Sequence, residues 1–229
     1  MAGHSHAKNV MHRKNAQDKK KAKIYAKLAK AISAAAQNDS NVETNLKLKF
    51  AIKQAQLANV PKNIIENAVN KKSKEKTEEI IYEGYSKNNE AILVKVLTDN
   101  RNKTSSQIKE IFKKNNGKIA KPNEVKFLFQ EVGEISVNGK DFETFTDDLI
   151  EFNLIDFDAD FKITCELKEF HKILNSLEKK YNILSAEINF ISKSLIPIEN
   201  KEELEELLNA LEENEDVLTC YHNAEISDD

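Results

Sequence analysis

Residues 91–117, AILVKVLTDNRNKTSSQIKEIFKKNNG, change from a strand pattern to a helix pattern within a few positions. The apolar residues from Ala91 to Leu97 predict a strand. A threonine that precedes a helical pattern is a favourable N-cap, so we expect a helix from Thr104 to Asn115, with Gly117 just beyond its end. This stretch therefore predicts a strand that is followed directly by a helix.

The flanking segments supply the other elements of the same sheet. Ile80-Ile81-Tyr82 predicts a strand before this stretch, and Val125, Phe127 and Phe129 predict a strand after it. Near the C-terminus, a further helix is expected before a strand at residues 217–221, because leucines recur there at helical spacing: Leu204, Leu207, Leu208 and Leu211. We expect these pieces to complete one sheet with helices on one face.

Residues 134–192 show an order of elements of their own. A strand and a helix are followed by two strands, at residues 155–157 and 161–165, then by a helix at about 169–180 and a last strand. This βαββαβ order is typical of a ferredoxin-like unit. We therefore interpret residues 134–192 as a domain inserted into another domain.

The N-terminal part predicts three helices. Apolar residues recur at helical spacing in the first: Ile24, Leu28, Ile32 and Ala35. The second is expected at residues 43–58, and Pro61 suits the first turn of the third. The predicted fold class is α+β: an N-terminal three-helix domain (1–76) followed by two ferredoxin-like-type α+β domains, one discontinuous (77–133 plus 193–229) and one inserted in it (134–192).

The charge of the chain is divided along its length. Residues 1–76 carry 17 Lys and Arg against 5 Asp and Glu, whereas residues 77–229 carry 18 against 33, although the net charge is only −3. Electrostatic fields act over a Debye length of about 10 Å, so a basic segment attracts polyanions even when the whole protein is acidic. Nucleic acid is therefore the expected partner.

The first predicted helix carries a cationic face. Five lysines lie within an arc of about 100° opposite the apolar residues, at ~100° per residue. A face of this kind is often only solvated surface, but basic residues also precede it, and we interpret the whole set as contacting phosphates: Lys8, His12, Arg13, Lys14, Lys19, Lys20, Lys23, Lys27 and Lys30. Such contacts depend on salt and not on base sequence, so they do not distinguish DNA from RNA.

The loop at residues 98–103, Thr-Asp-Asn-Arg-Asn-Lys, leads from a strand into a helix and has two interpretations. Free backbone N–H groups beside Arg101 and Lys103 would form an anion site. Alternatively, Asp99, Asn100 and Asn102 only turn the chain and cap the helix.

Several classes of protein are disfavoured. No apolar run approaches the ~18 residues that span a bilayer, and no secretory signal is visible, so a cytoplasmic protein with no membrane partner is expected. Cys165 and Cys220 lack metal-ligand spacing and are interpreted as buried small residues, and we expect no metal and no cofactor. The five glycines form no phosphate loop, and no catalytic motif is present, so we expect neither an enzyme, such as a nuclease, nor a small-molecule substrate.

Three motifs resemble the YebC/PmpR family. The opening stretch, with Gly3-His4-Ser5, His12-Arg13-Lys14 and Ala16-Gln17-Asp18, is similar to the start of that family. Residues 82–85, Tyr-Glu-Gly-Tyr, with residues 97–102 and Thr104 resemble its central motif, and Asp216-Val217 with Tyr221-His222-Asn223 resembles its C-terminal one. The resemblance covers nearly the whole chain. It departs at Ala7, where the family has an aromatic residue, and at residues 86–89, where the family has a glycine-rich turn.

The resemblance implies a three-domain, non-enzymatic regulator. Members of the family are usually labelled as DNA-binding transcriptional regulators, and some act on translation at the ribosome. Two interpretations therefore stay open. The chain binds duplex DNA and regulates transcription, or it binds ribosomal RNA and assists translation.

Overall fold

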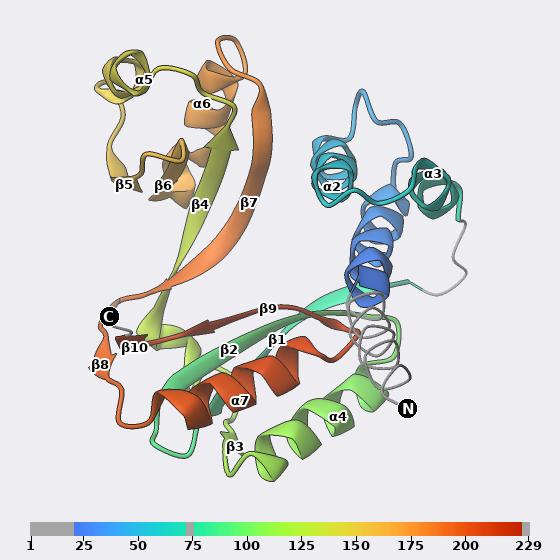
Figure 1. The fold of residues 1–229 in the computed structure, drawn as a ribbon, viewed down its shortest axis with the longest axis vertical. Helices are drawn as coiled ribbons and strands as arrows, with labels where there is room; N and C mark the ends of the chain where they lie inside the picture. The colour runs from blue at the N-terminus through green and yellow to red at the C-terminus, as the bar shows by residue number, and fades with distance from the viewer. Residues whose placement is uncertain (1–20, 72–75, 226–229) are drawn as a thin grey trace, which may run out of the picture. The chain divides into compact units, whose positions relative to one another are not determined.

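The structure is a computed structural model that describes residues 21–71 and 76–225. The chain divides into two compact units, Met1–Lys76 and Thr77–Asp229. Figure 1 shows helices alone in the first unit and both helices and strands in the second. None of the helices in the described ranges is long and apolar enough to cross a membrane.

Three helices form the described part of the first unit. A helix at residues 21–36 is followed by α2 (Leu46–Leu57) and α3 (Lys62–Asn70). Their buried core includes Ile32, Ala35, Leu48, Ala55 and Ile65. Ile24 was expected in this core and is 50% exposed, because the contacts of this helix with the core begin only at Tyr25.

The first sheet of the second unit is antiparallel, with the strand order β3-β1-β2-β9. Two helices, α4 and α7, pack against it through Ile108, Phe112 and three leucines. Its elements are β1 (Glu78–Tyr85), β2 (Ala91–Thr98), α4 (Arg101–Lys114), β3 (Lys118–Ile119), α7 (Lys201–Glu212) and β9 (Val217–His222). Two short strands, β8 (Ile196–Pro197) and β10 (Ala224–Glu225), form a separate parallel pair.

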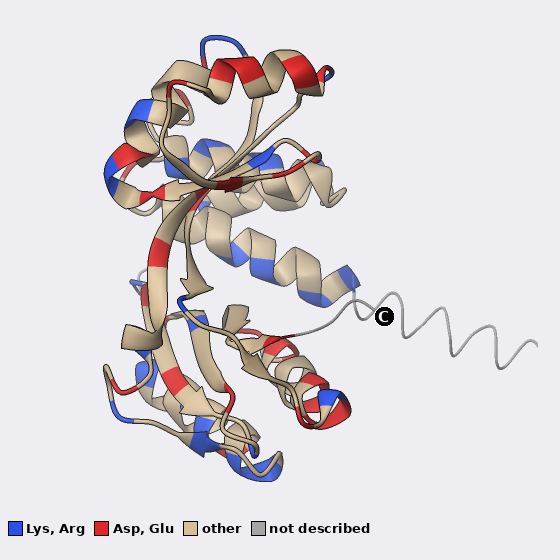
Figure 2. Ribbon diagram, turned by 90° about the vertical axis from the view of Figure 1, so that its left-hand side faces the viewer, with Lys and Arg blue, Asp and Glu red and all other residues tan. Residues whose placement is uncertain are grey.

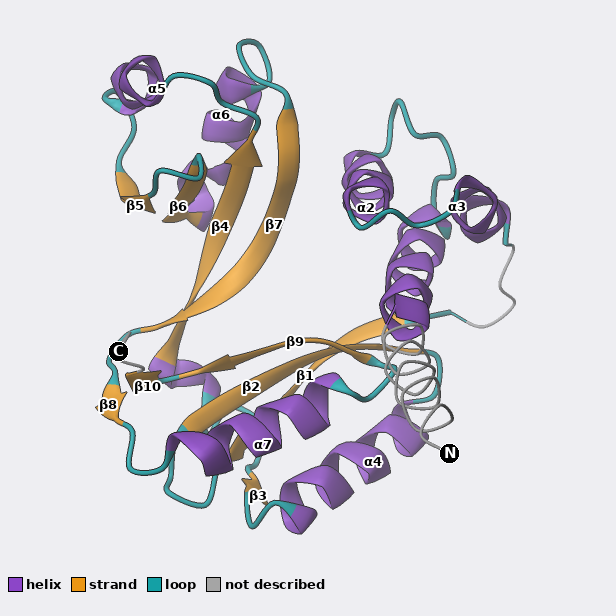
Figure 3. Ribbon diagram, in the orientation of Figure 1, coloured by secondary structure: helices purple, strands orange, loops and turns teal. Residues whose placement is uncertain are grey.

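The second sheet has the strand order β5-β6-β4-β7 and is also antiparallel (Figure 3). Its elements follow one another as β4 (Phe129–Val137), α5 (Phe142–Leu149), β5 (Leu154–Phe157), β6 (Lys162–Glu166), α6 (Leu167–Leu177) and β7 (Ile183–Ser192). The βαββαβ order and this strand order are those of a ferredoxin-like unit. The predicted α+β fold class is thus confirmed, whereas the boundaries of the three domains stay a prediction.

The strand expected through Val125, Phe127 and Phe129 is wrong in its first half, and its second half, β4, belongs to the second sheet and not to the first as expected. A short 3₁₀ helix, η1 (Lys126–Leu128), occupies that position, and β4 begins at Phe129. The reason is the buried carboxylate of Glu83, which accepts hydrogen bonds from the backbone N–H groups of Asn123 (2.6 Å), Val125 (2.7 Å) and Lys126 (2.7 Å). Because these groups all point at one carboxylate, the chain curves there and does not extend.

Candidate nucleic-acid interface

The helix at residues 21–36 carries part of the predicted basic face. Lys23 is exposed, whereas Lys27 and Lys30 are half-buried. Figure 2 colours the ribbon blue at lysine and arginine residues and red at aspartate and glutamate residues. The other candidates from this region lie outside the described residues: Lys8, His12, Arg13, Lys14, Lys19 and Lys20.

Helix α2 adds lysines that the sequence analysis missed. Lys47 and Lys49 are exposed and Lys53 is half-buried. Burial lowers the pKa of Lys53, and the charge of Lys49 one turn away lowers it further. Like charges at i and i+4 destabilise a helix, and nearby phosphates would relieve that repulsion. The i,i+4 spacing was visible in the sequence and could have indicated these residues.

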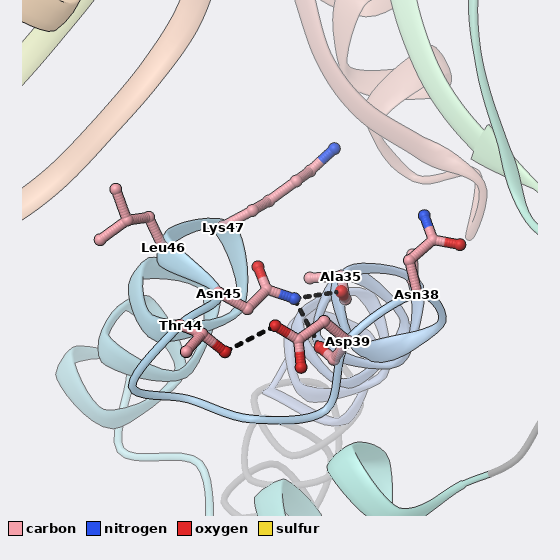
Figure 4. Close-up of a pocket in the computed structure, with 8 residues that line it drawn as sticks. Ala35, Asn38, Asp39, Thr44, Asn45, Leu46 and Lys47 are labelled. Atoms are coloured by element: carbon pink, nitrogen blue, oxygen red, sulfur yellow. Dashed lines mark hydrogen bonds between the residues drawn. The ribbon is translucent and has the colours of Figure 1, made fainter.

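A shallow hollow of about 470 Å³ lies where α2 begins (Figure 4). The side-chain amide of Asn45 donates to the backbone oxygens of Ala35 (2.8 Å) and Asp39 (2.6 Å). Asp39 accepts a hydrogen bond from the Thr44 hydroxyl at 2.7 Å, which lowers the pKa of Asp39. These hydrogen bonds join the end of the first helix to the start of α2, so the polar groups of this hollow order the loop between the two helices.

In the second unit, the predicted loop at residues 98–103 is shorter than expected. Helix α4 begins at Arg101, and its N-cap is Asn100, whose side chain accepts from the Lys103 N–H at 3.1 Å. Thr104, the expected cap, is fully buried, and its hydroxyl donates to the Asp216 carboxylate at 2.5 Å. Thr104 is therefore not the cap, because it lies in the first turn of a helix that already begins at Arg101.

The two candidate residues of this loop differ in their surroundings. Lys103 forms an ion pair with Glu215 at 3.0 Å, and this contact raises the pKa of Lys103. Arg101 is exposed, and no described carboxylate lies within ion-pair distance of its guanidinium. The backbone oxygen of Arg101 accepts a weak hydrogen bond from the Tyr82 hydroxyl at 3.4 Å. Their role in binding stays a prediction, and Arg101 is the better placed to meet an anion.

The central and C-terminal motifs meet at one end of the β2–β9 strand pair, and the C-terminal motif also bonds the start of β2 at the other end. At one end, Asp216 lies beside Thr98 and Thr104, and its backbone oxygen accepts from the Leu97 N–H at 2.8 Å. At the other end, the Asn223 side chain accepts from the Ala91 N–H at 2.7 Å. Asp216 and Asn223 therefore form hydrogen bonds that join the two ends of β2 to the segments that flank β9.

The turn at residues 86–89 replaces glycine with asparagine. Asn89 adopts a positive φ of 69°, a conformation that asparagine tolerates better than most residues. The Ser86 hydroxyl donates to the Glu90 carboxylate and accepts from the Asn88 and Glu90 N–H groups. Side-chain hydrogen bonds thus hold this turn, which contains no glycine.

The described residues contain no group of three or more His, Cys, Asp or Glu side chains placed to hold a metal ion. Cys165 is buried, as expected, and burial raises the pKa of its thiol to about 11. Cys220 is only partly buried. A thiol with so high a pKa is a poor nucleophile at neutral pH.

Comparison with known proteins identifies the family. Residues 5–75 match the model of the TACO1/YebC protein N-terminal domain, and residues 77–224 match that of the TACO1/YebC second and third domain. The chain belongs to the TACO1/YebC family. The resemblance of the three motifs is thereby confirmed over nearly the whole chain.

Relatives of the TACO1/YebC family share the full length of this chain. A probable transcriptional regulatory protein of Caldanaerobacter subterraneus is 39% identical over all of both chains. One from Rickettsia peacockii is 37% identical over all of this chain and 96% of its own. The crystal structure of a conserved hypothetical protein from Aquifex aeolicus has a TM-score of 0.77 and 33% identity, and the match covers 91% of each chain.

Proposed function

We propose that this chain is a cytoplasmic, non-enzymatic regulatory protein that binds nucleic acid through phosphate contacts from its helical unit, and that it acts as a DNA-binding transcriptional regulator. The observation that carries the proposal is the charge of the described helices. Residues 21–71 hold nine lysines against three acidic residues, and two of these lysines, Lys49 and Lys53, are kept one turn apart despite their repulsion. The names of the relatives support the transcriptional role.

The binding surface is tested by neutralising lysines. In K23Q/K27Q/K30Q, we expect weaker binding to duplexes of every sequence and a smaller dependence of affinity on salt, by roughly one unit of slope for each phosphate that a lysine no longer neutralises. The matched control is K113Q/K114Q/K168Q, which removes the same charge from exposed lysines of the second unit. An unchanged slope in the first variant, with its helical circular dichroism intact, would exclude this face from binding.

Ribosomal RNA is the alternative target, because phosphate contacts serve any duplex. The alternative is tested by sedimenting the purified protein with intact ribosomes at near-physiological salt in an excess of random duplex DNA. Retention on ribosomes would support a role in translation. Removal by the DNA competitor would support the transcriptional role.

A further inference from the structure

A second hollow, of about 490 Å³, lies in the second unit where β4 begins and β7 ends. The side chain of Phe127 lines it and is 63% exposed. Phe129 and Phe190 also line it, but both are buried in a core cluster with Val125. One aromatic ring is therefore presented to solvent above an apolar base.

Two ammonium groups lie beside this aromatic lining. The Lys193 Nζ donates to the backbone oxygen of Phe127 at 2.9 Å. The Lys126 Nζ lies 5.5 Å from the centroid of the Phe190 ring and pairs with Glu131 at 2.7 Å. Lys126, Lys193 and Glu131 are all partly exposed or exposed, so both ammonium groups are accessible from the solvent.

The buried carboxylate of Glu83 holds the backbone just before Phe127. It accepts hydrogen bonds from the backbone N–H groups of Asn123, Val125 and Lys126, and β4 begins two residues after Phe127. The backbone is therefore held on both sides of Phe127, whose ring shares a hollow with two lysines and two buried phenylalanines. The combination of an exposed ring, cations and an apolar lining, and not exposure alone, favours a binding role.

We propose that this hollow binds one base of a single-stranded nucleic acid, with the base stacked on Phe127 and the adjoining phosphates near Lys126 and Lys193. The proposal rests on the proposed function, because it assumes that the chain binds nucleic acid, and adds a contact with a base to contacts with phosphates. An aromatic ring flanked by cations is the usual means of holding an unpaired base. A base inside a duplex does not offer its face, so the ligand is a single strand or a loop.

The chain contains no tryptophan, so F127W introduces a single indole as a reporter of stacking. The probe is a 12-nucleotide single-stranded RNA with a terminal dye, whose anisotropy reports binding. We expect the indole emission of F127W to be quenched with the same midpoint as the anisotropy change. The control is I150W, since Ile150 is 77% exposed at the end of α5, and its emission should not change.

Removing the ring gives an independent test. F127A should weaken single-stranded RNA binding by roughly fivefold or more and leave duplex binding unchanged, while F127Y should bind as the wild type does. Anisotropy that rises without quenching in F127W would overturn the site and leave the proposed function standing. No anisotropy change for single strands or duplexes with the wild type would overturn both. A hollow that serves a protein partner would leave the emission of F127W flat with every RNA.

Discussion

The hydroxyl of Thr104 donates to the carboxylate of Asp216, with the two oxygens 2.5 Å apart, although 112 positions separate them in the chain. Thr104 is fully buried and Asp216 is 4% exposed. The bond joins the first turn of α4 to the start of β9. A buried carboxylate needs such donors, because removing one leaves a charged acceptor unsatisfied.

The first prediction concerns this bond. T104V keeps the shape of the side chain and removes the donor, so the free energy of unfolding should fall by about 1–3 kcal/mol. Urea unfolding measures the change. T146V is the control, because Thr146 lies on α5 and its hydroxyl donates only to the backbone oxygen of Phe142. If T104V and T146V lowered the free energy of unfolding equally, the bond from Thr104 to Asp216 would contribute no more than an ordinary hydroxyl-to-backbone bond.

The second prediction concerns Glu83. E83Q replaces a carboxylate that accepts three N–H groups with an amide that has one acceptor oxygen, so stability should fall by roughly 1.5–3 kcal/mol. Hydrogen exchange at Asn123, Val125 and Lys126 should accelerate. In the control E124Q, the exposed Glu124 side chain accepts only from the Lys121 N–H, and exchange should change little. Unchanged exchange in E83Q would contradict the prediction.

The third prediction concerns Gly133 in β4. A Cβ atom at this position would lie 2.1 Å from the Phe170 Cδ2, so G133A must displace the ring of Phe170 and cost about 1–3 kcal/mol. Because the clash is with the ring of Phe170 alone, G133A should lower the free energy of unfolding less in an F170A background than in the wild type. A double-mutant cycle of G133A and F170A measures this coupling. Additive losses would show that the clash is relieved elsewhere.

The order of elements was predictable because each element carries its own periodicity. The region near Phe127 was not. Alternating apolar residues at 125, 127 and 129 resemble a strand, but Glu83, about 40 positions earlier, curves this segment. Similarly, Asn100 and Thr104 are both favourable N-caps. The helix begins after Asn100, and Thr104 instead bonds Asp216, a contact that no local pattern contains.

The candidate binding residues show the same limit. Lys49 and Lys53 could have been found from their spacing, because both lie on one helix. The hollow around Phe127 could not have been found from the sequence, because Lys193 contacts the backbone oxygen of Phe127, which lies 66 positions earlier in the chain. Contacts of this kind depend on how β4 and β7 pair.

The fourth prediction concerns pH. Burial lowers the pKa of His222, although the Ala224 backbone and the Glu90 carboxylate act to raise it. The unfolded chain therefore binds more protons just below the ordinary histidine pKa of about 6.5, so His222 stabilises the fold fully above that pH and less as the pH falls below it. H222Q should reduce the loss of stability between pH 7 and 5, as measured by urea unfolding. H171Q is the control for replacing a histidine with glutamine at an exposed position, on α6. An identical pH dependence for H222Q and the wild type would contradict the prediction.

The fifth prediction separates stability from binding on α2. Burial lowers the pKa of Lys53, and the charge of Lys49 lowers it further, so the charged form of Lys53 is disfavoured in the unbound protein. K53Q should therefore leave stability within about 0.5 kcal/mol or raise it, while it weakens nucleic-acid binding. The control is K114Q, because Lys114 lies in the second unit and pairs with Glu110 at 2.7 Å on α4, so its loss should lower stability slightly and leave binding unchanged. Both effects of K53Q should shrink as salt rises, since each is electrostatic. If K53Q lost both stability and binding, Lys53 would be a residue that supports the fold. Lys49 and Lys53 would then no longer count as a binding pair.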